Sequence, residues 1–408
     1  MRIVATHMDY SLHWPARLQK LKEVVEANGD ELQVIEVATR GSPYEFSRTG
    51  AAAECDRQGW ITLFGDAELP RLSPRDIDRK LWAALERVSP DVVMAGPIAF
   101  PVGTTAVRWC RARRRGVIVT DDARLEDVPR SCFINTVKRC VYRNVDAMLV
   151  PAASHLPTCE YFGIAESRVF YGVDVVDNEW FARRAAVHRE SGCRELRGAG
   201  LPDKFFLGVG RQVPKKNWPM LVDAYAAYRK RVERPWDLVL VGDGPQRQNI
   251  DRRIGEVGNA GITLWPFLTQ AEMCGVYAAA SCLVLPSFHG ETWGLVVNEA
   301  MACGLPVLVS DQCGCASTLV REGENGWRFS PRRPEELTEA MVRMSALSSR
   351  DHAEMGEASC AIIREWSPER FAREAWSAIE AVRDVRRGFT SLASRAVLAV
   401  WRGRFRPT

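Results

Sequence analysis

Short apolar runs alternate with helix-period segments along most of the chain, and this rhythm limits the possible folds more than any other feature. Segments such as Ala16–Ala27 and Arg75–Val88 carry apolar residues at the spacing of one helical face. Repeated strand–helix–strand order predicts parallel sheets with right-handed crossovers. The strand-like runs are 2–6, 32–37, 60–64, 91–95, 117–120, 147–150, 168–171, 205–209, 238–241, 262–265, 282–285 and 306–309.

The second half of the chain repeats the pattern of the first, with helical segments predicted at 218–232, 246–257, 270–280 and 295–302. We therefore expect an α/β protein with two doubly wound, Rossmann-like domains that face each other across a cleft. The predicted domains are residues 1–178 and 203–366, joined through a segment rich in Arg, Glu and Gly. Residues 367–408 are predicted to be helices that return toward the first domain. Ligands of such sheets bind beyond the carboxyl ends of the strands.

Composition excludes several other classes of protein. The 408 residues are 46% hydrophobic and 26% charged, with a net charge of +4, which favours neither disorder nor binding of nucleic acid. No apolar run reaches the roughly 18 residues of a membrane-spanning helix. The chain starts directly in a strand-like run, so we expect no leader peptide and a cytoplasmic location. The twelve cysteines form no CxxC pair, so we expect no metal site and no cofactor.

Two motifs follow strands in the second half. The segment Gly208–Asn217 places Arg211 and Lys216 in a short loop before a helix, where both cations could bind phosphate oxygens. The alternative, a solvated basic loop, has about equal weight for this segment alone. Gly242-Asp243-Gly244-Pro245 follows the next strand, and its glycines would let the backbone approach a ligand closely. For that segment taken alone, a plain strand–helix turn is the favoured interpretation.

The third motif is residues 286–306, which contain two carboxylates eight positions apart. Glu291 is predicted to lie in the loop after a strand and Glu299 in the helix that follows. The amides of Trp293, Gly294 and Leu295 would then point into the same space as the carboxylates. The alternative is an amphipathic helix with one glutamate on its wet face, and the apolar residues around Glu299 weaken that alternative.

Taken together, these motifs resemble the retaining family 4 glycosyltransferases of GT-B fold (glycosyl transferases group 1). The resemblance is dense from about Phe205 to Phe329 and extends to the first half only in outline, through the strand–helix rhythm and the segment Tyr171–Asp174. It implies a nucleotide-sugar donor bound by the second domain. The donor would be a UDP- or GDP-sugar.

The resemblance also implies roles for individual residues. Arg211 and Lys216 match the family's diphosphate-binding pair, Glu299 matches the glutamate that holds the ribose hydroxyls, and Glu291 matches the glutamate near the donor sugar. Three further donor contacts are expected. The amides of Trp293, Gly294 and Leu295 would contact the phosphate and the sugar, and Gly242 would let the backbone approach the donor closely. Phe267 lies in the loop expected near the base.

The first half departs from the family at two points. The family commonly has a glycine pair in its first loop, where this chain has the segment Met8–Pro15. Where the family often has a histidine near the reaction centre, after the fourth or fifth strand, this chain has Asp121. Asp121 is therefore a candidate catalytic residue, since a carboxylate accepts hydrogen bonds from hydroxyls. The alternative is that Asp121 and Asp122 form a turn or a helix cap.

The expected reaction is transfer of a sugar, with retention, to a hydroxyl of a glycan or lipid-linked acceptor in polysaccharide or glycoconjugate biosynthesis. A sugar-nucleotide epimerase or a phosphorylase of the same fold is the alternative enzyme, and a scaffold that binds nucleotide sugars without catalysis is the alternative binding protein. The pair of glutamates favours transfer.

Positive charge is concentrated in two segments. Five arginines lie between Arg108 and Arg115, and seven lie between Arg383 and Arg406, where apolar residues such as Trp401 and Phe405 are interspersed. Such segments are candidates for peripheral contact with an anionic membrane surface, here the inner face of the cytoplasmic membrane. The alternative, which we favour, is a tail that packs on the first domain and leaves a solvated basic edge.

Overall fold

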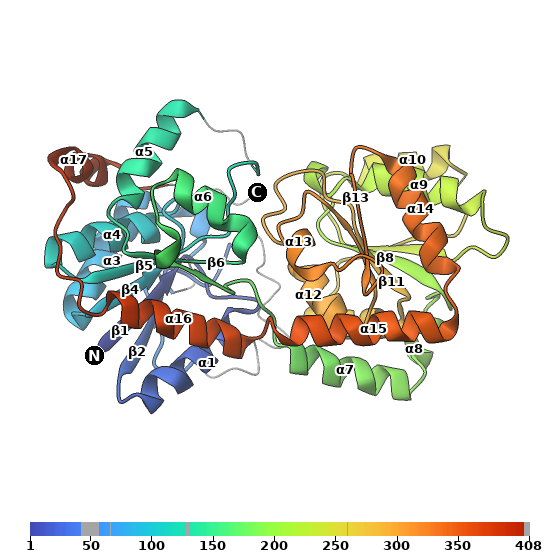
Figure 1. Ribbon diagram of the computed structural model, residues 1–408, viewed down its shortest axis with the longest axis horizontal. Coiled ribbons are helices and arrows are strands. Elements are labelled where there is room, and N and C mark those ends of the chain that lie inside the picture. The colour runs from blue at the N-terminus through green and yellow to red at the C-terminus, as the bar shows by residue number, and fades with distance from the viewer. Residues whose placement is uncertain (42–56, 66, 128–130, 259, 404–408) are drawn as a thin grey trace. The chain divides into compact units, whose positions relative to one another are not determined.

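The computed structural model describes residues 1–41, 57–65, 67–127, 131–258 and 260–403. The chain divides into two compact units, each built around its own sheet (Figure 1). The first unit comprises Met1–Leu125, Pro129–Val175 and Pro368–Thr408. The second comprises Glu126–Val128 and Val176–Ser367.

The first unit has a parallel sheet of seven strands in its described part, in the order β3-β2-β1-β4-β5-β6-β7. Its strands are β1 (Arg2–His7), β2 (Glu31–Glu36), β3 (Ile61–Thr62), β4 (Val92–Ala95), β5 (Gly116–Thr120), β6 (Ala147–Val150) and β7 (Val169–Tyr171). Its helices are α1 (Trp14–Ala27), α3 (Pro74–Val88), α4 (Pro101–Arg113), α5 (Cys132–Tyr142), α6 (Leu156–Tyr161), α16 (Pro368–Val382) and α17 (Leu392–Val400).

Both faces of this sheet are buried, as continuous apolar strands require. Val4, Val93 and Val117 pack in one core with residues of α3 and α4, while α1 and α16 pack against each other over the opposite face. The helices begin and end where the sequence dictates. For example, α1 stops at Asn28 because Gly29 adopts a left-handed conformation with φ of 74°.

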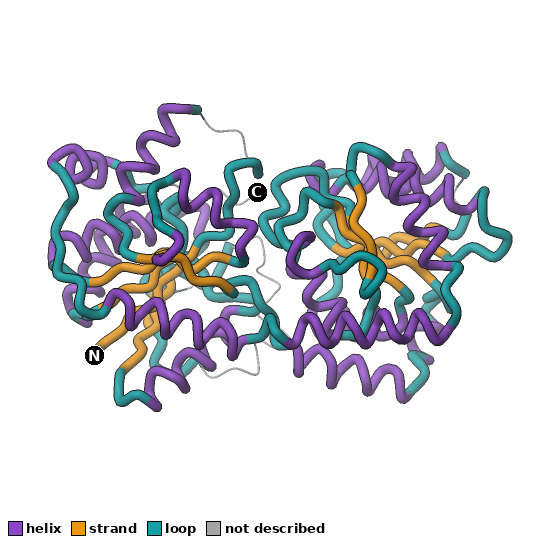
Figure 2. The backbone as a smooth tube through the Cα atoms, viewed as in Figure 1, coloured by secondary structure: helices purple, strands orange, loops and turns teal. Residues whose placement is uncertain are grey.

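The second unit has a parallel sheet of six strands among its described residues, in the order β10-β9-β8-β11-β12-β13. Its strands are β8 (Phe205–Val209), β9 (Asp237–Val241), β10 (Ile262–Trp265), β11 (Cys282–Leu285), β12 (Val307–Ser310) and β13 (Gly326–Phe329). Its helices are α7 (Asn178–Glu190), α8 (Arg194–Gly198), α9 (Trp218–Arg229), α10 (Arg247–Glu256), α11 (Gln270–Ala279), α12 (Leu295–Ala302), α13 (Ala316–Leu319), α14 (Pro334–Ser345) and α15 (Ser349–Arg364). In both units the strands form the interior and the helices lie around them (Figure 2).

Two details differ from the sequence-based expectation. The segment predicted to join the domains is not a linker, because α7 packs on α11 and α12 and therefore belongs to the second unit from Val176 onward. Strand β13 was not predicted, since only four residues pair there and their burial does not follow a continuous apolar run.

The tail after α16 packs on the first unit. Phe389, Val397 and Trp401 contact its core, and Leu398 is fully buried in it. Helix α17 lies against α5 and α4. Phe405, Arg404 and Arg406, which the membrane hypothesis also invoked, lie outside the described residues. The inner side of the tail therefore packs on the first unit, as the alternative to membrane contact predicted.

The arginines of residues 108–115 are largely neutralised. Arg108 pairs with Asp78, Arg113 with Glu86 and Arg115 with Asp91, while Arg111 pairs with Asp146 in the interior. This segment therefore does not supply the continuous positive face that its composition suggested. No helix in the described ranges has both the length and the apolar composition needed to cross a bilayer.

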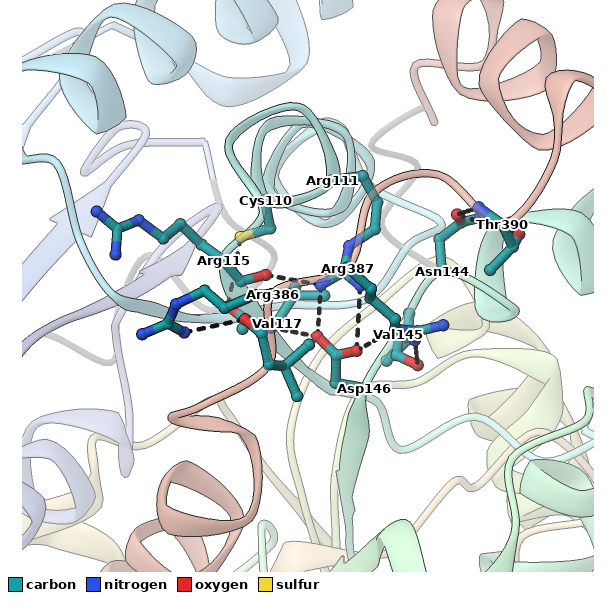
Figure 3. A network of polar contacts seen from close by, with 12 residues as sticks. Cys110, Arg111, Arg115, Val117, Asn144, Val145, Asp146, Arg386, Arg387 and Thr390 are labelled. Carbon is teal, nitrogen blue, oxygen red and sulfur yellow. Dashed lines mark hydrogen bonds and ion pairs between the residues drawn. The ribbon is translucent and has the colours of Figure 1, made fainter.

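Asp146, just before β6, joins three parts of the first unit (Figure 3). Its carboxylate accepts hydrogen bonds from Arg111 of α4, from the Val117 amide of β5 at 2.9 Å, and from Arg387 of the tail at 2.7 Å. The Arg111 side chain has no exposure to solvent, so its charge depends on this single carboxylate. Arg387 also donates to the Val145 carbonyl at 2.8 Å, which ties the tail to the sheet.

Asp146→Ala should destabilise the protein by about 3–5 kcal/mol, because it leaves the buried guanidinium of Arg111 without its counter-charge. Glu31→Ala is the matched control, since it removes the carboxylate of the exposed pair with Arg2 and should cost less than about 1 kcal/mol. Urea denaturation followed by circular dichroism measures both. Equal shifts for the two variants would contradict the importance assigned to Asp146.

Candidate functional site

The predicted donor-binding residues lie at one edge of the second sheet. Strands β10, β9, β8 and β11 are neighbours and run parallel, so the loops that follow them emerge side by side. These loops contain Phe267 after β10, Gly242 after β9, Arg211 and Lys216 after β8, and Glu291 after β11. Helix α12 starts next to the last of them.

The loops after β8 and β9 are in direct contact. Gln212 donates its amide to the Asp243 carbonyl at 2.8 Å and its side chain to the Gly242 carbonyl at 2.9 Å. A Cβ atom at Gly242 would lie 2.1 Å from the Gly210 carbonyl oxygen, so only glycine fits there. This glycine permits the close approach of one loop to another, and its approach to a ligand stays a prediction.

Lys216 and Glu291 form a buried ion pair across the β8 and β11 loops. The Lys216 Nζ lies 2.6 Å from the Glu291 Oε2, and both residues are less than a tenth exposed. The Ser287 hydroxyl donates to the same oxygen at 2.7 Å. One carboxylate oxygen thus accepts both a charged and a neutral hydrogen bond.

These neighbours set the charge state of Glu291. Burial alone would raise the pKa of this carboxyl, but the charges of Lys216 and Lys215 outweigh burial and hold the pKa below its ordinary value. Glu291 is therefore ionised at neutral pH. A buried anion beside a buried cation gives this edge of the sheet both an acceptor for hydroxyls and a donor for anions.

Glu299 lies in the second turn of α12, as the spacing from Glu291 predicted. Its Oε2 accepts a hydrogen bond of 2.6 Å from the Tyr277 hydroxyl of α11. Burial and then the charge of Glu299 raise the pKa of Tyr277 well above its ordinary value, so this phenol keeps its proton and remains a donor. Tyr277 therefore holds one oxygen of Glu299 in place.

The start of α12 is fixed by the loop after β12. The Gly314 amide donates to the Glu291 carbonyl at 3.0 Å and the Cys315 amide to the Trp293 carbonyl at 3.2 Å. Trp293 is buried, donates to the Asn298 side-chain oxygen at 2.9 Å and packs against Trp366 with the two rings tilted by 43°. The first-turn amides that begin at Gly294 and Leu295 have no acceptor within the helix itself. These N–H groups give the N-terminal end of the helix its partial positive charge.

Arg211 and Phe267 lie in the same row of loops but are more exposed. Arg211 follows β8, and its backbone carbonyl accepts from Trp218 at 3.2 Å. Phe267 is 40% exposed.

Asp121 belongs to the first unit, at the carboxyl end of β5, whereas the other predicted site residues belong to the second. Its Oδ2 accepts from the Tyr142 hydroxyl at 2.7 Å and its Oδ1 from the Ala123 amide at 3.0 Å. Burial raises the pKa of Asp121, while Lys138 acts in the opposite direction. The bond to Ala123 is the turn that the sequence left open as an alternative.

Two contributors to the site were not predicted from the sequence. Ser287 holds Glu291, and its position directly after β11 was a signal that sequence reasoning did not use. Tyr277 holds Glu299 from 22 positions away on another helix, and no local pattern indicates that contact. Over the described ranges, no group of three His, Cys, Asp or Glu side chains is placed to hold a metal ion.

The loops after β8, β9, β10 and β11 lie in a segment that is similar to known proteins. Residues 195–359 match the family model described as glycosyl transferases group 1. The chain is 34% identical over 158 residues to D-inositol 3-phosphate glycosyltransferase of Gordonia bronchialis, covering 36% of this chain and 34% of that protein. It is 29% identical over 147 residues to the alpha-D-kanosaminyltransferase of Streptomyces kanamyceticus, covering 36% and 37%. The matched segment thus spans little more than a third of these relatives.

Solved structures extend the likeness to both units. Sucrose-phosphate synthase from Thermosynechococcus elongatus superposes with a TM-score of 0.71 at 18% identity and covers 93% of this chain and 98% of its own. Anabaena Alr3699/HepE in complex with UDP superposes with a TM-score of 0.70 at 18% identity and covers 93% and 100%. The chain therefore has the GT-B fold, and residues 195–359 of its second unit match the glycosyl transferases group 1 model.

Proposed function

We propose that this protein is a glycosyltransferase that binds a nucleotide diphosphate sugar at the carboxyl edge of the second sheet. The observation that carries the proposal is the buried group of Lys216, Glu291 and Ser287, which lies within the segment matching the family model. A buried charged pair at the end of parallel strands is costly unless it serves a ligand or a structural contact.

The donor diphosphate would lie between Lys216, Arg211 and the start of α12. Lysine has three donor hydrogens, so Lys216 can hold Glu291 and a phosphate oxygen together. Arg211 provides a second cation from the same loop, and the first-turn amides near Gly294 and Leu295 add partial positive charge. Together these groups would stabilise the negative charge that develops on the departing diphosphate.

The two glutamates would hold hydroxyls of the donor. Glu291, kept ionised by its lysines, would accept from the sugar, and Glu299, held by Tyr277, would accept from the ribose. Phe267 would cover the base. UDP is the first nucleotide to test, because solved structures of Alr3699/HepE contain UDP and UDP-glucose. A GDP-sugar is the other expected donor.

The proposed reaction exchanges one bond at the anomeric carbon for another. The bond to the diphosphate oxygen breaks, a bond to the acceptor oxygen forms, and the acceptor's hydroxyl proton leaves with the diphosphate. We propose retention at that carbon, a hexosyl donor and a hydroxyl of a glycan or lipid-linked molecule as acceptor. The catalytic role of Asp121 stays a prediction, with its carboxylate already bonded to Tyr142 and Ala123.

Lys216→Ala should weaken UDP or GDP binding by about 2 kcal/mol or more, roughly 30-fold, because it removes a cation beside the diphosphate. Lys204→Ala is the control, since Lys204 precedes β8 at the opposite end of that strand. Isothermal titration calorimetry measures both, and the double variant Lys216→Ala/Glu291→Gln removes the effect of an unpaired buried carboxylate. Affinity within twofold of wild type in both Lys216 variants would refute the assignment.

Glu291→Gln should leave the affinity for the free nucleoside diphosphate within about threefold, because the sugar and not the phosphates contacts this residue. Turnover with the sugar nucleotide should fall by about 100-fold or more, which corresponds to roughly 2.7 kcal/mol. Steady-state kinetics and titration separate the two effects. Loss of diphosphate affinity equal to that of Lys216→Ala would show that Glu291 acts only by holding the lysine.

Glu299→Gln should weaken donor binding by about 1.5–3 kcal/mol, since a charged acceptor is replaced by a neutral one. Tyr277→Phe should have a smaller effect of the same kind, because it removes only the hydroxyl that orients the carboxylate. Glu335→Gln, at the exposed start of α14, is the control. Unchanged donor affinity in Glu299→Gln would rule out contact with the ribose.

A further inference from the structure

Helix α17 has an outer face without a single polar side chain. Leu392, Ala393, Ala396, Ala399 and Val400 are all exposed, and Leu392 and Val400 retain 84% and 80% of their accessible surface. At 100° per residue these five positions cover an arc of about 120°. A helix face that meets only water normally carries polar residues across such an arc.

The opposite side of α17 is anchored, so this face has a fixed orientation. Leu398 is fully buried, and the Ser394 hydroxyl lies 3.4 Å from the Cys140 carbonyl of α5. Beyond the end of the helix, Trp401 reaches the Ile98 carbonyl at 3.5 Å. Figure 1 shows α17 on the outside of the first unit, beside α5. The helix cannot turn its apolar strip inward without losing these contacts.

The surroundings of the strip are basic. Arg395 lies at its edge on α17, and Arg143 ends the neighbouring α5. Arg383 and Arg386, with Asp384 between them, lie on the segment that leads from α16 to α17. All four are exposed, and none makes an ion pair with a carboxylate in the part of the chain that the structure describes. By contrast, the inward arginines of this tail, Arg387 and Arg402, pair with Asp146 and Asp78.

We propose that the α17 face, defined as Leu392, Ala393, Ala396, Ala399 and Val400 with the arginines around it, docks on the surface of an anionic lipid bilayer. Apolar side chains would enter the interface while the guanidinium groups meet lipid phosphates. These residues differ from those that composition suggested, because four of the five arginines of 108–115 are paired and Trp401 packs inward.

A second copy of the chain fits this face less well. The helix has nine residues, so it is about 13 Å long and about 10 Å across, far short of the roughly 800 Å² per partner of a stable interface. Two such faces would also bring their arginines together, which like charges oppose. A lipid surface supplies the opposite charge and needs no matching shape.

The test is flotation of the full-length protein with vesicles of phosphatidylglycerol and phosphatidylcholine, compared with phosphatidylcholine alone. We expect binding to the anionic vesicles at low salt and release near about 0.5 M salt. Leu392→Glu/Val400→Glu should lower the bound fraction by about fivefold or more, without loss of folding because both side chains are exposed. Val187→Glu, at a 64% exposed valine of α7, is the matched control and should bind like wild type.

Three results would overturn the proposal. The first is a wild-type protein that does not float with anionic vesicles at low salt. The second is equal flotation of the wild type and the Leu392/Val400 variant, or equal loss in that variant and in Val187→Glu. The third is a dimer in light scattering that the Leu392/Val400 variant converts to a monomer, which would identify the face as a contact between copies.

Discussion

Parallel strand order is the constraint on which the candidate site depends. Because every strand of the second sheet points the same way, the loops after β8, β9, β10 and β11 emerge at one edge, although they are separated by dozens of residues in the chain. The cations of the β8 loop can therefore reach the carboxylate of the β11 loop. A change in the position of one strand would move that loop out of the row.

Each unit contains a buried carboxylate, and their surroundings differ in an informative way. Asp146 is saturated by two arginines and a backbone amide, and all of its partners join elements of the first unit. Glu291 has a lysine and a serine, and its loop is held by the loop after β12 rather than by the core of a sheet. The first arrangement stabilises a fold, whereas the second lies where parallel sheets bind ligands.

The tail has one side that packs on the first unit and another that is exposed. Its apolar residues divide between a side that packs on the first unit, with Leu398 and Trp401, and the α17 face that does not. Its arginines divide in the same way, with Arg387 and Arg402 paired inward and Arg395 exposed. Composition alone describes both sides as one basic, apolar segment.

Periodicity along the chain was enough to predict the strand–helix rhythm, the two parallel sheets and the positions of Glu291 in a loop and Glu299 in a helix. These features follow from periodicities over a few residues, which local physics sets. It did not indicate β13, whose four residues become a strand only by pairing with β12. Three features required the packed structure: Lys216 pairs with Glu291, 75 positions away, Tyr277 holds Glu299, and four of the five arginines of 108–115 have carboxylate partners. Such pairings depend on which loops and helices the packed sheets bring together, and no local pattern in the chain encodes that proximity.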